Sequence, residues 1–131
     1  MIGLLIITHG ALGESLIQCI CHVINKRPLH IAQLGVAAQD EPNEVLDEAH
    51  RLLTSVDDGE GVLVLTDIYG ATPSNIAMKL LVPGKIEGVA GVSVPMLLRV
   101  LTYREKSDIQ TVVQKAISGA CDGVLHIKGR S

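Results

Sequence analysis

Short apolar runs alternate with amphipathic stretches along most of the chain. The runs are rich in Ile, Val and Leu and have the length of buried strands. Between them, apolar residues recur every three or four positions, as on one face of a helix. Strands are expected at residues 2–7, 29–36, 61–67, 86–92 and 124–127. Helices are expected at residues 11–24, 41–56, from 72 onward, 95–103 and 107–123.

The order of these segments predicts an α/β fold. Alternating strands and helices, followed by two successive helices and a last strand, indicate a flavodoxin-like, doubly wound sheet with helices on both faces. We expect four parallel strands in the order 2-1-3-4. The two successive helices reverse the chain direction, so residues 124–127 should form an antiparallel edge strand. Residues 1–131 are expected to form a single domain.

Capping signals mark two of the helices. Thr72 is expected to cap the third helix through its hydroxyl, with Pro73 as the first helical residue. Ser107 and Gln110 have the spacing of a capping box for the fifth helix, which Gly123 is expected to end.

Composition and charge narrow the function classes. The chain is 47% apolar but contains no Phe and no Trp, so its core must be aliphatic, which suits parallel strands covered on both faces. The net charge is −3 and no basic cluster is denser than Lys26-Arg27, which argues against nucleic acid or an anionic membrane as ligand. No apolar run approaches the roughly 20 residues that span a bilayer, and the N-terminus lacks a signal-peptide pattern. A cytoplasmic protein without membrane insertion is expected.

Neither the cysteines nor most of the histidines have the spacing of a metal site. Three cysteines are expected to be buried as small hydrophobic side chains: Cys19, Cys21 and Cys121. Four histidines share no spacing typical of metal ligands: His22, His30, His50 and His126. The chain also lacks a Walker A motif and a Rossmann glycine motif. The sequence therefore predicts no metal and no bound cofactor.

The predicted topology brings two distant polar residues together. Ligands of open α/β sheets bind at the carboxyl ends of the strands, where the winding direction reverses. The first and third strands flank this reversal and are followed by His9 and Asp67, which lie 58 positions apart. We therefore expect these two side chains to meet over one crevice.

The pair suits phosphoryl chemistry. A neutral imidazole can attack a phosphoryl group through one nitrogen, while a carboxylate orients the ring through the other nitrogen and stabilises the cation that forms. Two predicted helix N-termini flank this position and favour an anion. The residues expected around the phosphate are Gly10, Gly70, Ala71 and Thr72.

Three motifs together resemble the IIA component of the mannose family of the bacterial sugar phosphotransferase system. They are IITHG at residues 6–10, LVLTDIYGATPSN at residues 63–75 and VAGVSVPML at residues 89–97. The resemblance covers essentially the whole chain and implies a cytoplasmic phosphotransferase with a phosphohistidine intermediate. It implies that His9 accepts a phosphoryl group from phospho-HPr and passes it to a separate IIB component for sugar uptake and phosphorylation. Asp67 would support the histidine, and the Thr72 hydroxyl would lie by the phosphate.

The resemblance also implies a homodimer in which the last strand is exchanged between subunits. Such an exchange would give residues 124–127 a strand to pair with.

Other interpretations use the same histidine. The chain could be a regulatory sensor of phosphorylation state without a sugar permease, or the phosphotransferase subunit of a dihydroxyacetone kinase. A histidine phosphatase or phosphomutase fits less well, because those enzymes have Arg where this chain has Thr8, and no basic clamp is visible here.

Overall fold

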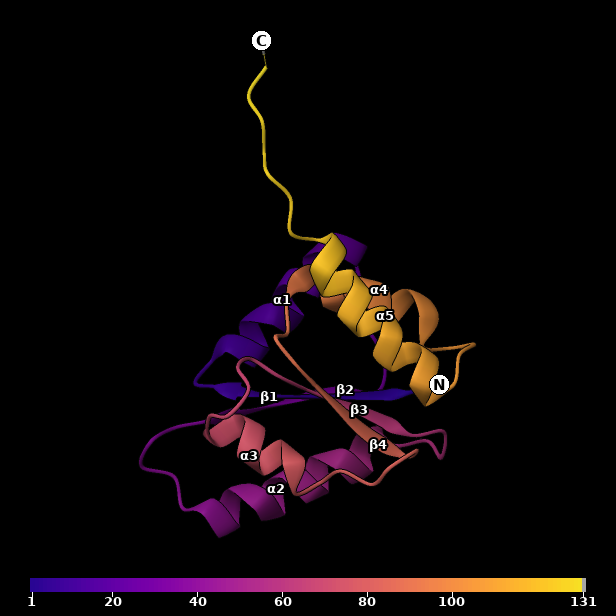
Figure 1. Ribbon diagram of the computed structural model, residues 1–131. Helices are drawn as coiled ribbons and strands as arrows, with labels where there is room; N and C mark the ends of the chain where they lie inside the picture. Colours follow the sequence, from indigo (N-terminus) through magenta and orange to yellow (C-terminus); the bar gives the residue numbers. More distant parts are fainter. Residues whose placement is uncertain (131) are drawn as a thin grey trace.

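A four-stranded parallel sheet forms the middle layer of the computed structural model, which describes residues 1–130 (Figure 1). Its strands are β1 (Gly3–His9), β2 (Ile31–Val36), β3 (Val62–Thr66) and β4 (Ile86–Ala90). They lie in the order β2-β1-β3-β4, and every neighbouring pair is parallel. This confirms the predicted flavodoxin-like topology and the strand order 2-1-3-4.

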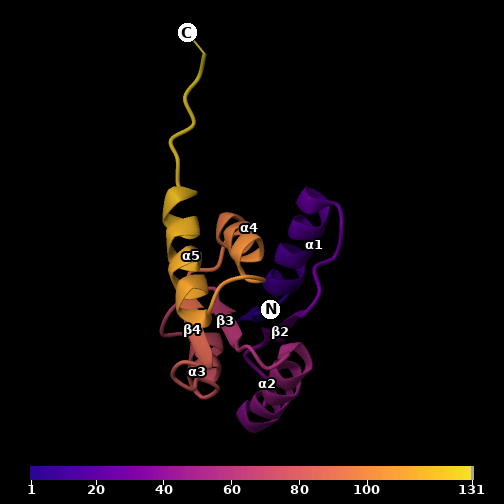
Figure 2. The same cartoon turned by 90° about the vertical axis from the view of Figure 1, so that its right-hand side faces the viewer.

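Helices cover both faces of the sheet. They are α1 (Leu12–Ile24), α2 (Pro42–Val56), α3 (Thr72–Met78), α4 (Val94–Tyr103) and α5 (Ile109–Asp122). Figures 1 and 2 show α1, α4 and α5 on one face and α2 and α3 on the other. The described helices include none long and apolar enough to cross a bilayer.

Burial on both faces explains why the central strands are continuous apolar runs. Leu4 and Ile6 of β1 point into the core under α1, α4 and α5, while Leu5 and Ile7 point into the core over α2 and α3. All four side chains are fully buried. A strand with one wet face would alternate apolar and polar residues instead.

Two of the predicted helix caps are wrong. The N-cap of α3 is Ala71, and Thr72 is already helical. Proline is tolerated throughout a first turn, so Pro73 alone does not determine which preceding residue is the cap. In α5 the cap is Asp108, whose carboxylate accepts a hydrogen bond from the Thr111 amide at 2.9 Å, in place of the Ser107 capping box. The prediction that Gly123 ends α5 is confirmed.

The C-terminal segment differs from the expected edge strand. Residues 124–130 run away from the body of the protein as an extended tail (Figures 1 and 2). Within residues 1–130 the segment 124–127 pairs with no strand, and Leu125 is 78% exposed. A strand needs a neighbour that accepts its hydrogen bonds, and α5 ends with the chain leading away from β4, so this one chain supplies no such neighbour.

The cysteines are also more exposed than predicted. Cys19 and Cys121 are exposed, and Cys21 is half-buried. The apolar stripe of α1 is wide enough to include Cys19, but the helix packs through Leu16, Ile17 and Ile20, which turns Cys19 toward solvent. The periodicity of a wide stripe does not determine which of its edges is buried.

Candidate functional site

His9 and Asp67 meet at the carboxyl edge of the sheet. His9 is the last residue of β1, and Asp67 directly follows β3, its neighbour in the sheet. The ring Nδ1 of His9 lies 2.7 Å from Asp67 Oδ2, and the His9 amide donates a second hydrogen bond to the same oxygen at 3.1 Å. The structure thus brings together the two side chains that the topology pairs.

The carboxylate of Asp67 is held in its ionised form. Partial burial by itself raises the pKa of Asp67, but hydrogen bonds from the His9 ring, the His9 amide and its own amide outweigh this effect and hold the pKa below its ordinary value. The Ile68 amide also donates to Oδ1, at 3.0 Å. With 15% of its side chain exposed, the carboxylate is partly shielded from water.

An ionised carboxylate determines the tautomer of the histidine. Asp67 can only accept hydrogen bonds, so Nδ1 of His9 must carry the proton, and Nε2 of the neutral ring then has a free lone pair. The His9 side chain is 54% exposed, so the ring can be reached from solvent. A nucleophilic nitrogen is therefore oriented from behind by a carboxylate, as in hydrolytic triads.

The two glycines expected near a phosphate have other hydrogen-bond partners. The Gly10 amide donates to the Val36 carbonyl at 3.0 Å, and the Gly70 amide donates to Ser74 Oγ at 3.3 Å. Both glycines have positive φ, +54° for Gly10 and +88° for Gly70, and a Cβ at either position would meet open space. Their value to the site lies in the backbone conformation and the open approach, and their amides are already engaged.

The other two expected residues stand at the start of α3. Its N-cap is Ala71, whose methyl group cannot accept a hydrogen bond from the first turn. Thr72 is exposed and lines the same pocket as His9. The start of α3 therefore presents amide groups and a hydroxyl on the side where His9 lies.

Two buried hydroxyls hold the loops of the site, and sequence reasoning did not assign either of them. Thr8 is completely buried, and its Oγ1 accepts a hydrogen bond from the Gly13 amide at 2.9 Å, which ties the first turn of α1 to the end of β1. Ser74 is also buried and holds the loop that follows Asp67 through Gly70. Both hydroxyl residues lie within the motifs that the sequence analysis singled out. Their roles could not be assigned from the sequence, because the amides that they bind, those of Gly13 and Gly70, are known only from the structure.

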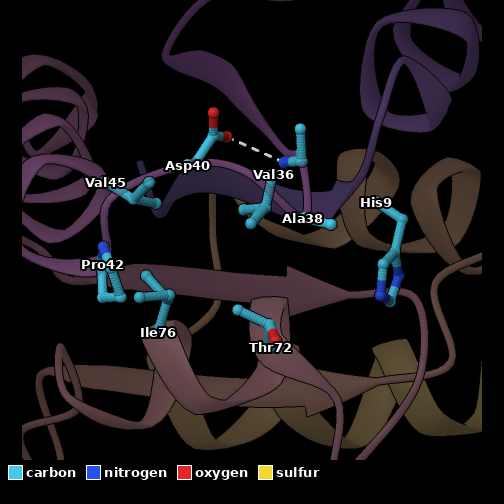
Figure 3. Close-up of a pocket in the computed structure, with 9 residues that line it drawn as sticks. His9, Val36, Ala38, Asp40, Pro42, Val45, Thr72 and Ile76 are labelled. Carbon is cyan, nitrogen blue, oxygen red and sulfur yellow. Dashed lines mark hydrogen bonds between the residues drawn. The ribbon is translucent and has the colours of Figure 1, made fainter.

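A pocket of about 290 Å³ opens beside His9 (Figure 3). It lies between the β2–α2 loop and α3. Its lining residues are His9, Val36, Ala37, Ala38, Asp40, Pro42, Val45, Thr72 and Ile76. The part contributed by the β2–α2 loop was absent from the sequence prediction, because that loop carries no recognisable motif.

The site has a nucleophilic ring and an orienting carboxylate, the groups that transfer of a phosphoryl group through histidine requires. Within residues 1–130 no three His, Cys, Asp or Glu side chains are placed to hold a metal ion together. The chemistry that the arrangement supports is nucleophilic attack by the His9 ring.

Comparison with known proteins identifies a family. Residues 3–117 match the model of the EIIA-man family, described as the PTS system fructose IIA component. The mannose-specific EIIAB component of Escherichia coli K12 is 25% identical over 131 residues, which is 98% of this chain and 40% of that protein. The fructose-specific EIIA component of Bacillus subtilis is 37% identical over 60 residues, covering 45% of this chain and 41% of that protein. The chain thus spans less than half the length of the curated relatives it matches.

Solved structures share the fold over nearly the full chain. A mannose/sorbose-specific IIA subunit from Enterococcus faecalis has a TM-score of 0.86 at 19% identity, covering 99% of this chain and 97% of that one. The EIIA component from Streptococcus agalactiae has a TM-score of 0.84 at 24% identity, covering 96% of this chain and 97% of that one. At these identities the likeness concerns the fold. Because the family model covers most of the sequence, this chain belongs to the EIIA-man family of phosphotransferase-system IIA components.

Proposed function

We propose that this chain is a phosphohistidine carrier of the sugar phosphotransferase system. His9 accepts a phosphoryl group from phospho-HPr and passes it to a IIB component, which uses it for sugar uptake and phosphorylation. The observation that carries the proposal is the 2.7 Å contact between His9 Nδ1 and Asp67 Oδ2, which leaves Nε2 as the attacking nitrogen.

Bonds and charges balance in this transfer, and no proton is taken from solvent or released to it. The N–P bond of the donor's phosphohistidine breaks as a new N–P bond forms to Nε2 of His9. The donor ring, which carries a proton on its other nitrogen, leaves as neutral imidazole. His9 keeps its Nδ1 proton and becomes a cation, and the Asp67 carboxylate stabilises that charge at 2.7 Å. Transfer to the acceptor is the same exchange in reverse.

The proposed phosphate site uses the start of α3. The Ala71 and Thr72 amides and the Thr72 hydroxyl are the groups on this side that suit an anion. Gly10 and Gly70 leave space for the phosphoryl group, because neither carries a side chain.

We also propose a cytoplasmic homodimer of single IIA-type domains, residues 1–131, that exchange their C-terminal strands. The exposed tail and the outer edge of β4 support this arrangement. Within residues 1–130 the segment 124–127 pairs with no strand, and β4 is bridged on its outer side at Ile86, by Val82. Analytical ultracentrifugation should give the mass of a dimer, and deletion of residues 124–131 should give a monomer. A dimer that survives the deletion would contradict strand exchange.

The central experiment is phosphorylation from phosphoenolpyruvate in the presence of enzyme I and HPr. The wild-type chain should acquire phosphate that is labile in acid and stable in base, and His9→Gln should acquire none. His50→Gln, which alters an exposed histidine on α2, is the matched control and should be labelled like the wild type. Labelling that persists in His9→Gln would refute the assignment. Addition of a IIB component should then remove the phosphate from the wild-type chain.

A further inference from the structure

We infer that a pocket at the amino edge of the sheet binds a small organic anion with an aliphatic body, a medium-chain carboxylate. This amino-edge pocket lies between the carboxyl ends of α1 and α4 and the loop that joins α1 to β2, and its volume is about 640 Å³. Figure 2 shows α1 and α4 side by side on one face of the sheet. The pocket is at the opposite end of β1 from His9 and takes no part in the proposed phosphoryl transfer.

Four aliphatic side chains give the amino-edge pocket an apolar lining. Ile24 of α1 and Leu98 and Leu101 of α4 are half-buried and pack against the main core. Leu29 of the α1–β2 loop is 70% exposed and also lines the pocket. Because these side chains are still partly in water, an aliphatic ligand that covers them removes apolar surface from water.

Positive charge surrounds the apolar lining, although the protein as a whole has a net charge of −3. Lys26 and Arg27 are exposed and line the pocket, and neither forms a salt bridge within residues 1–130. The Met1 amine also lines the pocket but is paired with two carboxylates. Glu105 is the one carboxylate of the lining. The rim therefore presents two available cations beside an apolar surface.

Arg104 adds a third cation at the base of the pocket. It is only 4% exposed, its partners are three backbone carbonyls, and it forms no salt bridge within residues 1–130. These bonds use three of the five N–H groups of a guanidinium. Burial outweighs the attraction of Glu105 and Asp58 and lowers the pKa of Arg104. A buried cation without a carboxylate partner stabilises an anion placed near it.

The size of the amino-edge pocket and the number of its cations select a small ligand. A volume of about 640 Å³ lies within the range of about 300–1,000 Å³ of small-molecule sites. Segments that bind anionic membranes typically carry about four to eight clustered basic residues, and this rim has only Lys26 and Arg27. We expect the carboxylate of the ligand to lie at these two side chains and its aliphatic chain to cover Leu29 and Leu101.

Three ligands test the two halves of this chemistry. Octanoate has both the charge and the aliphatic body, octanamide keeps the body without the charge, and acetate keeps the charge without the body. With the methyl-labelled full chain, octanoate should shift the methyl signals of Ile24, Leu29 and Leu101 saturably, with a dissociation constant of about 1 mM. Octanamide should bind about fivefold more weakly, and acetate should not saturate in the same range.

Two results with these ligands would overturn the inference. One is equal affinity for octanoate and octanamide, which would remove the role of the cations. The other is the absence of saturation at an octanoate concentration about ten times the expected dissociation constant.

Paired charge variants locate the anion. Lys26→Gln combined with Arg27→Gln should weaken octanoate binding about fivefold and leave octanamide binding unchanged. Lys79→Gln combined with Lys85→Gln removes the same charge at exposed positions outside the pocket, so it should affect neither ligand. Equal weakening of octanoate binding by the two double variants would refute a site at Lys26 and Arg27.

A second pair of variants tests the apolar lining. Leu29→Gln alters an exposed side chain and should weaken octanoate and octanamide alike, by about fivefold. Val23→Gln makes the same kind of change on α1, at a 56% exposed residue that does not line the pocket, and should leave both affinities at the wild-type value. An unchanged octanoate affinity in Leu29→Gln would contradict the proposed position of the aliphatic chain.

Two further measurements exclude the other occupants and the other site. His9→Gln should bind octanoate like the wild type, and loss of binding in this variant would place the anion at the carboxyl edge and refute the inference. The wild-type chain should stay in the supernatant when phosphatidylglycerol vesicles are sedimented. Co-sedimentation with the vesicles would identify a membrane surface as the occupant and would equally refute it.

Discussion

The two edges of the sheet differ in how far a polar side chain is buried and hydrogen-bonded. At the amino edge, Arg104 is only 4% exposed and donates hydrogen bonds to the carbonyls of Ile2, Leu29 and His30. Its own carbonyl accepts a hydrogen bond from the Ile2 amide at 3.1 Å. At the carboxyl edge, the His9 side chain is 54% exposed, and its ring is bonded to Asp67 through Nδ1.

The helix starts differ in whether their N-cap side chains accept a hydrogen bond. The N-caps of α2, α4 and α5 are Glu41, Ser93 and Asp108, and each accepts a hydrogen bond from its own first turn. The N-caps of α1 and α3, the helices that follow His9 and Asp67 along the chain, are alanines. The starts of α1 and α3 therefore have no side-chain hydrogen bond from their N-cap residues, although the Gly13 amide of α1 is bonded to Thr8.

The largest effect is expected at the amino edge. Arg104→Met keeps the aliphatic stem but removes the donor to three carbonyls, so the free energy of unfolding should fall by about 3–5 kcal/mol in urea titrations. Transfer to His9, measured on folded protein, should keep the wild-type rate. Arg99→Met is the control, because Arg99 forms an exposed ion pair with Asp122 and its loss should cost less than about 1 kcal/mol. An equal fall in the free energy of unfolding in the two variants would show that the buried Arg104 guanidinium stabilises the fold no more than the exposed ion pair does.

Asp67→Asn should produce the converse result at the carboxyl edge. The amide cannot stabilise the imidazolium charge, so quench-flow measurements should show transfer slowed by about 100-fold or more. The thermal midpoint should change little, because the Asn amide oxygen can still accept a backbone hydrogen bond that Asp67 accepts. A wild-type rate would remove Asp67 from the mechanism.

A cap introduced at the site tests the helix contrast directly. Ala71→Asp should stabilise the fold by about 0.5–1 kcal/mol, since its carboxylate can cap α3. The same charge repels the incoming phosphoryl group, so transfer should slow about tenfold. Asp108→Ala, at a helix start far from the chemistry, should cost about 1 kcal/mol and leave transfer unchanged. Faster transfer in Ala71→Asp would contradict the view that this helix start is reserved for an anion.

The smallest effect concerns pH. The folded-state pKa of Asp67 lies below its ordinary value of 3.8, so the ionised carboxylate stabilises the fold above the unfolded-state pKa, and this contribution is lost as the pH falls through the folded-state pKa. The difference in unfolding free energy between the wild type and Asp67→Asn should be constant above about pH 5 and should shrink below about pH 4. Denaturant titrations from pH 3 to pH 7 measure it. A difference that grows on acidification would contradict the sign of the shift.

Patterns along the chain predicted the His9–Asp67 pair but not the pocket wall beside it. The strand ends and the strand order were sufficient to pair His9 with Asp67, because parallel neighbours end at the same edge. The β2–α2 loop carries no motif, so the apolar wall around Val45 became visible only in the fold. Thr8 and Ser74 likewise gained a role only when their amide partners were known.

The sequence by itself determined the alternation of strands and helices, the parallel sheet and the two residues at its carboxyl edge. Apolar periodicity and chain order are local properties, and they suffice for these features. The tertiary structure decided that Cys19 faces solvent, that the Gly10 and Gly70 amides are engaged, and that residues 124–127 leave the body unpaired. Each of these depends on which atoms distant segments bring into contact, and a one-dimensional pattern does not contain that information.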